Sequence, residues 1–320
     1  MTLSRSQVRC LVDFGAHLPL MDFGAHPYTL EHLVAYTRTA AQYDFSVLAA
    51  NDHLVFSVPW LDGPTALAAV LGHSGDMTLA TTVALPVVRG PVPLAKTLAS
   101  IDRLSDGRLI VAVGPGSSQQ DYEAVGIDFE ERWERLDEAV CALRALWQSD
   151  REPFAGRFYS TEGMTLEPRP ARPDGPPVWI GSWGSEAGLR RVARLGDGWL
   201  ASAYNTTPAL FRGAKEYLDS QLLRHGKDPA TYPNALGTMW FYLTEDRAEA
   251  DRVMRERVVP TVHRPEAVLR ERLPIGPAEL FAEKLSEFER AGVQRIFIWP
   301  VADEARQLAR FCEQVRPAVS

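Results

Sequence analysis

One group of polar residues stands out for its chemistry, because it directly follows an apolar run. Asn51, Asp52 and His53 come after the apolar run 45–50. A histidine whose ring is oriented by a neighbouring acid is a common proton donor or acceptor near neutral pH. The simpler alternative is that Asp52 and His53 only cap the loop that follows. Because barrel enzymes place catalytic groups where strands end, we take Asp52 and His53 as candidate catalytic residues.

Two loops rich in glycine and serine are candidates for holding a negatively charged group. In the second loop Ser185 opens a helical pattern, so backbone N–H groups gather there at the positive end of a helix dipole, which suits a phosphate. Plain turns and an ordinary helix cap are the alternatives. The small residues are Gly114, Gly116, Ser117 and Ser118 in the first loop, and Gly181, Ser182, Gly184 and Ser185 in the second.

The elements that must position these residues alternate regularly along the chain. About eight short apolar runs, each followed by a helical pattern, predict parallel α/β units, and eight such units close naturally into a (β/α)8 TIM barrel. A doubly wound open sheet is the rival, but the first turn, at 15–17, lacks the glycine-rich dinucleotide fingerprint. The predicted strands are 10–14, 45–50, 78–83, 109–113, 178–180, 199–201, 237–243 and 295–299.

Helical patterns and turn formers complete the expected organisation. The segment 151–177 is rich in proline and glycine and predicts a hairpin insertion before the fifth strand, within a single domain over 1–320. The clearest helix has its apolar stripe at Phe129, Trp133, Leu136, Val140, Leu143 and Trp147.

Composition narrows the class of protein. The chain has 320 residues, of which 46% are hydrophobic and 23% are charged, as in folded globular proteins. Its net charge of −7 and its lack of basic runs argue against nucleic acid as a partner. Cys10, Cys141 and Cys312 are scattered, which favours a reduced, cytoplasmic protein. No signal peptide, membrane span or metal-binding spacing is expected from the sequence.

Several motifs, in order along the chain, together resemble the luciferase-like monooxygenase superfamily. The resemblance runs over about residues 8–200. Within it, Ser105 to Arg108 is the strongest motif, and we expect it to be a structural turn without a catalytic role. The motifs are 102–109 (DRLSDGRL), 114–116, 122–126, 131–147, 154–159, 167–170, 176–181 and 195–199.

The resemblance implies a barrel that uses a flavin-type cofactor. The sequence looks most like the branch that uses the deazaflavin coenzyme F420, with reduced FMN as the alternative. In that branch an acid and a histidine after strand two lie beside the reactive ring, and they match Asp52 and His53. A non-proline cis peptide at the end of strand three would fall at Thr82-Val83. The two loops described above would hold the cofactor tail and phosphate: Gly116, Ser117, Ser118, Gly181, Ser182, Gly184 and Ser185.

Two departures from the family pattern bear on the function. Asp121 stands where members usually have glutamate, and Ser117 stands where a sugar-phosphate-oxidising relative has a catalytic acid, which argues against that substrate. We therefore expect a two-electron oxidoreductase that exchanges hydride with a small organic substrate. A monooxygenase served by a separate flavin reductase is one alternative, and a non-catalytic flavin-binding relative is another.

The substrate pocket and the assembly are the least constrained expectations. Apolar tryptophans hint at a hydrophobic substrate, and the residues expected near it are His17, His26, Trp60 and Trp240. The resemblance also implies a homodimer.

Overall fold

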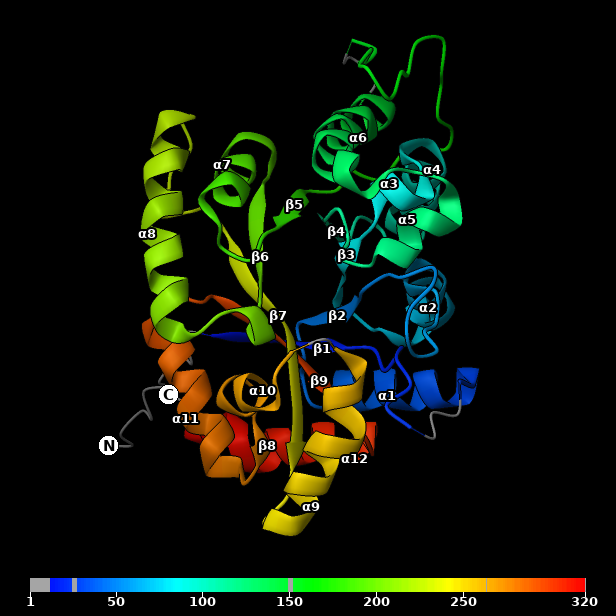
Figure 1. Ribbon diagram of the computed structural model, residues 1–320. Coiled ribbons are helices and arrows are strands. Elements are labelled where there is room, and N and C mark those ends of the chain that lie inside the picture. Colours follow the sequence, from blue (N-terminus) through cyan, green and yellow to red (C-terminus); the bar gives the residue numbers. More distant parts are fainter. Residues whose placement is uncertain (1–11, 25–27, 149–151, 263, 320) are drawn as a thin grey trace, which may run out of the picture.

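A closed ring of eight parallel strands forms the centre of the computed structural model, which describes residues 12–24, 28–148, 152–262 and 264–319. Strands pair in chain order, and β9 closes the ring between β7 and β1, so the expected (β/α)8 barrel is confirmed (Figure 1). The ring consists of β1 (Asp13–His17), β2 (Val47–Ala50), β3 (Thr78–Ala84), β4 (Leu109–Val113), β5 (Val178–Gly181), β6 (Gly198–Ser202), β7 (Asn234–Leu243) and β9 (Arg295–Pro300). The short β8 (Ile275–Gly276) pairs with the end of β7.

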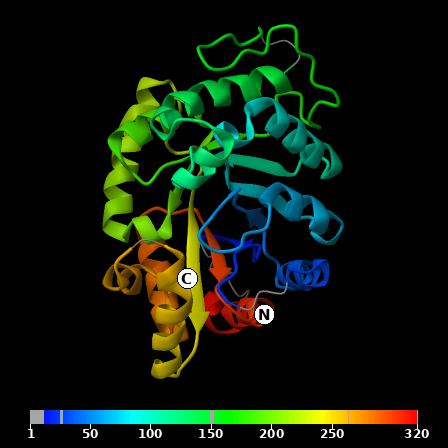
Figure 2. The same ribbon diagram turned by 45° about the vertical axis from the view of Figure 1, so that its right-hand side comes forward.

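Helices surround the barrel on its outside (Figure 2). Several of these helices begin at a residue whose side chain caps the helix. At the start of the first helix, the Thr29 side chain accepts a hydrogen bond from the backbone N–H of His32. The helices are α1 (Leu30–Gln42), α2 (Gly63–Val70), α3 (Pro86–Arg89), α4 (Pro91–Leu104), α5 (Gln119–Val125), α6 (Arg132–Trp147), α7 (Glu186–Leu195), α8 (Pro208–Arg224), α9 (Arg247–Val253), α10 (Glu266–Arg272), α11 (Ala278–Arg290) and α12 (Glu304–Arg310).

The interior of the barrel is filled by two large rings among small side chains. Trp179 and Phe297 are both buried there. The small and aliphatic residues packed around them are Val47, Ala49, Ala80, Ala112, Leu200 and Ala235. The larger core lies between the strands and the helices, where the predicted stripe of α6 packs except at its first turn.

The first strand lies three residues later than the sequence predicted. We expected a strand at 10–14 and a turn at 15–17, but β1 spans Asp13–His17, and residues 10 and 11 lie outside the described part of the chain. Gly15 lies within this strand, where the ring of Phe297 leaves no room for a side chain. A Cβ at this position would lie 2.5 Å from that ring. The glycine that we interpreted as a turn signal is thus a packing feature of the barrel.

One half-buried and one buried carboxylate, those of Glu138 and Asp102, bind the segment between α6 and β5. Its only short pairing in the described residues is the antiparallel bridge between Ala155 and Ser160. Glu138 on α6 accepts hydrogen bonds from three successive backbone N–H groups of this hairpin, at 157–159. Asp102, at the end of α4, accepts one from the backbone N–H of Ala171 at 3.0 Å.

The DRLSDGRL motif is a structural turn, as expected. Asp106 has a φ of 55°, in the left-handed region that turns use. Arg108 donates from Nε to the backbone oxygen of Ser105 at 2.9 Å. Asp102, fully buried, also accepts from Nη2 of Arg172 at 2.7 Å, so the motif joins the end of α4 to the inserted segment.

Replacing Asp102 should therefore destabilise the fold. In Asp102→Ala the backbone N–H of Ala171 and the guanidinium of Arg172 lose their acceptor, and we expect the free energy of unfolding to fall by about 2 kcal/mol. Urea unfolding measures this change. Glu162→Ala, at an exposed site in the same inserted segment, is the control and should stay within about 0.5 kcal/mol. Equal stability of both variants would contradict the anchoring role.

Candidate active site

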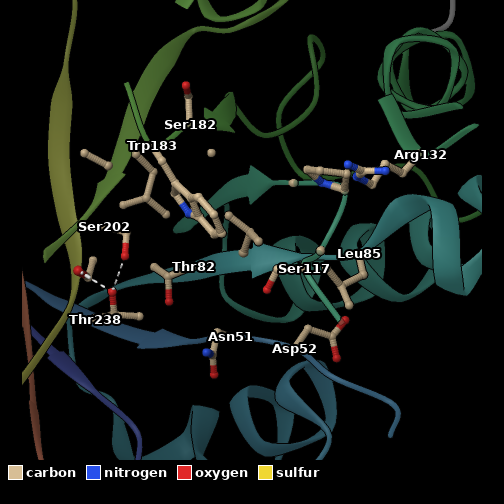
Figure 3. Close-up of a pocket in the computed structure, with 18 of the residues that line it drawn as sticks. Asn51, Asp52, Thr82, Leu85, Ser117, Arg132, Ser182, Trp183, Ser202 and Thr238 are labelled. Atoms are coloured by element: carbon tan, nitrogen blue, oxygen red, sulfur yellow. Dashed lines mark hydrogen bonds between the residues drawn. The ribbon is translucent and has the colours of Figure 1, made fainter. Parts of the chain in front are cut away.

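A cavity of about 490 Å³ opens where the strands of the barrel end (Figure 3). This is the end of the barrel where such enzymes carry out their chemistry. The predicted residues that line it are Asp52, His53, Thr82, Val83, Gly116, Ser117, Gly181, Ser182 and Ser185. The other lining residues are Asn51, Leu85, Gly114, Pro115, Phe129, Arg132, Trp133, Trp183, Leu200, Ala201, Ser202, Tyr204, Gly237 and Thr238.

His53 is oriented by Asp121, not by Asp52 as we expected. Nδ1 of His53 lies 2.7 Å from Oδ2 of Asp121. The other oxygen of Asp121 accepts the backbone N–H groups of Leu54 and Val55, at 2.8 and 2.7 Å. Because an ionised carboxylate only accepts hydrogen bonds, this pairing places the proton of a neutral ring on Nδ1 and leaves Nε2 as a hydrogen-bond acceptor. Asp121 is fully buried, so its carboxylate is shielded from water, whereas His53 lines the cavity.

Asp52 is instead bound by an arginine that the sequence analysis missed as a partner. Arg89, at the end of α3, donates from Nε and Nη2 to the two carboxylate oxygens of Asp52, each at 2.6 Å. It also pairs with Asp62, the cap of α2. Burial raises the pKa of Asp52, and the Arg89 pair acts in the opposite direction. Asp52 and His53 lie in the loop after β2, where each side chain has a different partner although the two residues are neighbours in sequence.

One edge of the cavity depends on a close approach between three strands. The Thr82-Val83 peptide bond is cis, as the resemblance implied, and the pairing of β3 with β4 shifts register there. The Val83 side chain packs against Gly181 so closely that a Cβ on that glycine would lie 2.9 Å from Cγ1 of the valine. Gly181 therefore keeps this wall of the cavity flat and apolar.

A second part of the cavity lining is polar and contains unpaired groups. Figure 3 shows Thr82, Ser202, Thr238 and Asn51 near one another on one side of the cavity. Oγ of Ser202 and Oγ1 of Thr238 lie 2.9 Å apart. Oγ1 of Thr82 and Oδ1 of Asn51 are buried and have no hydrogen-bond partner among the described residues. Buried polar atoms are costly to leave unpaired, so this wall fits a ligand with polar edges.

Thr238 has an unusual backbone for its residue type. Its φ is 55°, and a β-branched residue is rare in the left-handed region. The pairing of β7 with β9 shifts register between Leu236 and Met239, so Thr238 lies in a bulge. Bulges of this kind redirect a side chain, here toward the cavity. Only the structure reveals this, because the sequence shows a threonine in an ordinary strand pattern.

The mouth of the cavity has a cation and two indoles. The Arg132 guanidinium stacks over Phe129, with Cζ 3.9 Å from the ring centroid. Trp133 is 37% exposed and Trp183 is 53% exposed. We expected Trp133 in the core stripe of α6, but the first turn of this helix faces the cavity instead. The exposure of two large aromatic rings at a cavity rim is typical of a ligand-binding surface.

Two predicted cofactor residues, Ser118 and Gly184, are not among the residues that line the cavity. Ser118 has its hydroxyl 3.5 Å from the backbone oxygen of Val55. The N–H of Gly184 donates to Oγ of Ser182 at 3.3 Å, and Ser185 caps α7 through the N–H of Gly188. The second loop thus has the cap geometry that was the alternative to a phosphate site, together with two serines that line the cavity.

The residues expected around the substrate form an aromatic cluster beside the cavity. Trp60 contacts His53 edge to face, with ring centroids 4.7 Å apart, and Trp240 stacks on Tyr204 at 5.2 Å. His17 is buried and stacks on Trp299 at 3.8 Å. None of His17, Trp60 and Trp240 lines the cavity itself. His26 lies outside the described residues.

Metal-binding clusters and membrane-spanning helices are both absent from the described residues. No group of three or more histidine, cysteine, aspartate or glutamate side chains there is placed to hold a metal ion. No helix in the described ranges is both long and apolar enough to cross a membrane.

The burial of His17 makes a prediction about acid stability. Burial lowers the pKa of His17 to about 3, against the opposing effect of its hydrogen bond to the Leu18 backbone oxygen. An unfolded chain takes up this proton below about pH 6.5, whereas the folded chain resists it, so stability falls as pH decreases from 6.5. His17→Phe keeps the stacked ring and removes the proton site.

We expect the stability of His17→Phe relative to wild type to increase by about 2 kcal/mol between pH 7 and pH 5. Urea unfolding of both proteins at the two pH values measures it. A stability difference that does not change with pH would show that His17 is not a buried neutral base.

Comparison with known proteins places the chain in a family. Its residues 15–313 match the model of the luciferase-like monooxygenase family. An F420-dependent hydroxymycolic acid dehydrogenase of Mycobacterium tuberculosis is 30% identical over 64% of this chain, and the match spans only 57% of that relative. An F420-dependent glucose-6-phosphate dehydrogenase of Intrasporangium calvum is 28% identical, over 92% of this chain and 96% of the relative.

A solved structure agrees with this placement at the level of the fold. An F420-dependent secondary alcohol dehydrogenase, in complex with an F420-acetone adduct, superposes with a TM-score of 0.81. It covers 97% of this chain and 99% of its own, at 21% sequence identity. On the extent of the family match, this chain belongs to the luciferase-like monooxygenase family.

Proposed function

We propose that this protein is a coenzyme F420-dependent oxidoreductase that transfers hydride between the coenzyme and a small organic alcohol or carbonyl compound. The observation that carries the proposal is the His53–Asp121 pair, which presents one imidazole nitrogen to the cavity for proton exchange. The names of several relatives support the choice of coenzyme F420 over FMN.

The described residues fit such a cofactor. Val83, Leu200 and Ala201 offer apolar surface for a flat ring, and the unpaired atoms of Asn51 and Thr82 offer polar partners for its edge. Ser182, Ser185 and the Arg132 guanidinium lie around the cavity where a phosphate group would be neutralised. When bound, the deazaflavin ring supplies or accepts the hydride.

The chain's own residues handle the proton that accompanies the hydride. During alcohol oxidation Nε2 of His53 accepts the hydroxyl proton, and during carbonyl reduction the same atom returns it. The Asp121 carboxylate stabilises the protonated ring and holds it in one orientation through Nδ1. Phe56 and Trp60 contact the His53 ring, with centroids 4.4 and 4.7 Å away, and exclude water from that side. Arg89 keeps Asp52 paired, so His53 is the base beside the substrate.

The substrate class follows from the surroundings of His53. The neighbouring side chains are aromatic, and the position that holds an acid in a sugar-phosphate-oxidising relative is Ser117 here. We therefore propose secondary alcohols with apolar substituents as substrates, and glucose 6-phosphate as a poor one. Loss of the coenzyme's visible absorbance with 2-propanol and longer secondary alcohols measures this activity.

Removing the proposed base should slow turnover strongly and leave cofactor binding largely intact. For His53→Ala we expect kcat to fall by about 10²- to 10⁴-fold, the usual contribution of general acid–base catalysis. The dissociation constant of coenzyme F420, measured by its fluorescence, should change less than about threefold because the phosphate-binding loops are untouched. Unchanged turnover would contradict the role of His53, and binding without turnover in wild type would favour the non-catalytic alternative.

Asp121 should act through His53 as a positioning residue. In Asp121→Asn the amide faces Nδ1 and disturbs the tautomer, so kcat should fall by about 10²-fold or more while KM changes little. The double variant with His53→Ala should be no slower than His53→Ala alone, because both changes remove one function. Asp76→Asn, at an exposed site, is the control. Independent, multiplicative losses would contradict the coupling.

Cofactor titration separates the proposal from the monooxygenase alternative. Coenzyme F420 should bind more tightly than FMN, and turnover should consume no oxygen, because deazaflavins transfer hydride and react poorly with oxygen. Oxygen uptake with reduced FMN from a flavin reductase would overturn the proposed chemistry. The homodimer and the cytoplasmic location stay predictions from the sequence.

A further inference from the structure

A chain of hydrogen bonds joins an arginine beside the cavity to the polar part of its lining. Nη2 of Arg264, in the connection between β7 and β8, donates to Oδ1 of Asn205 at 3.0 Å. Nδ2 of Asn205 donates to Oγ of Ser202 at 3.1 Å, and this oxygen lies 2.9 Å from Oγ1 of Thr238 (Figure 3). Ser202 and Thr238 both line the cavity. The chain thus joins the segments after β6 and β7 to the cavity lining.

The direction of every bond in this chain is fixed by the chemistry of its two ends. A guanidinium only donates, so the amide oxygen of Asn205 faces Arg264 and its amide nitrogen faces Ser202. At the other end, Oγ1 of Thr238 donates to the backbone oxygen of Gly237 at 2.7 Å, because a carbonyl only accepts. The single hydroxyl proton of Thr238 is thereby used, so Ser202 donates to Thr238.

Neither hydroxyl group of the Ser202–Thr238 pair therefore has a proton left for a ligand. Each oxygen donates one hydrogen bond and accepts one within the chain, and each has two lone pairs, so both oxygens can still accept. Burial raises the pKa of Tyr204, whose neutral phenol lies beside Asn205 and Ser202 and frees no proton of either hydroxyl. The pair consequently accepts hydrogen bonds from a ligand and donates none.

We propose that the Ser202–Thr238 pair binds the imide N–H group of the cofactor ring, and that Arg264 is the positioning residue that keeps this pair in its accepting form. The inference rests on the proposed function, since a deazaflavin ring carries an imide N–H between two carbonyl groups along its polar edge. Oγ1 of Thr82, which is buried and has no partner among the described residues, can donate to one of those carbonyl groups.

Arg264 has a second contact, and it would explain the residue by packing alone. Its Cζ lies 5.6 Å from the centroid of the Trp183 ring, which lines the cavity. A packing role predicts that Arg264 affects all ligands of the cavity alike. The hydrogen bond to Asn205 predicts instead an effect on the preference between ligands that differ only in the N–H group. Ligand chemistry therefore separates the two roles.

Binding of two forms of the coenzyme tests the accepting pair. The probes are coenzyme F420 and its derivative methylated at the imide nitrogen, which loses the N–H and keeps both carbonyl groups. Fluorescence titration gives each dissociation constant, and the ratio of the two constants measures the preference for the N–H form. We expect wild type to bind the N–H form at least about tenfold more tightly, because the methyl group leaves buried acceptors unpaired.

Variants at Arg264 separate hydrogen-bond direction from the size of the methyl group. In Arg264→Met the Asn205 amide loses the donor that fixes its orientation, so Ser202 and Thr238 can also donate. The ratio of the two dissociation constants should then fall to about threefold or less. Arg264→Lys retains a donor for Asn205 and should restore the ratio of wild type.

Two further variants control for packing and for charge. Trp183→Leu removes the ring that Arg264 covers and leaves the hydrogen-bond chain in place, so it should change both dissociation constants by the same factor. Arg255→Met removes an exposed arginine from the same connection between β7 and β8, and its ratio should match that of wild type. Thermal unfolding confirms that each variant is folded.

The results that would overturn the inference differ from those that would overturn the proposed function. Equal binding of the two forms by wild type would show that the Ser202–Thr238 pair does not select the N–H group, although the cofactor assignment would stand. An Arg264→Met variant that keeps the full preference would remove Arg264 from the inference. If wild type binds neither form, the cofactor assignment itself fails, and the inference fails with it.

Discussion

The Asp121 carboxylate is the interaction on which the candidate site depends. It lies at the start of α5, and its two oxygens bind the His53 ring and two backbone N–H groups of the loop after β2. One buried side chain therefore joins the loops that follow two strands and orients the His53 ring. A buried carboxylate that accepts three hydrogen bonds is costly to rearrange, so the loop and the ring have one defined arrangement. The resemblance implied a glutamate at this position, and the shorter aspartate makes all three contacts.

Around this pair the barrel provides two walls of different character. Val83 and Gly181 form a flat apolar wall by close approach, and Ser202 and Thr238 form a polar one through a bulge in β7. The difference matters because a flat conjugated ring is apolar on its faces and polar along its edge. Each wall uses a local irregularity: a shifted register in β3 and a left-handed threonine in β7.

The architecture was predictable from the sequence because it follows from periodicity. Apolar runs such as 109–113 match β4 residue for residue, since a strand buried on both faces has a clear pattern. The start of β1 was not predictable, because Gly15 looks like a turn residue until the Phe297 ring is placed beside it. The residues of the site lie where strands end, as the sequence predicted. Which of these side chains pair with one another was not predictable from the sequence. Asp121 and Arg89 lie far along the chain from His53 and Asp52, and only the closed barrel brings each to its partner.

The two rings inside the barrel have a consequence for the route by which a ligand enters and leaves. Trp179 and Phe297 fill the interior of the barrel, so a ligand reaches the cavity from the end where the strands finish. Any ligand of this cavity must leave by the same end. The packing of the barrel interior, and not the affinity of the ligand, therefore fixes this route.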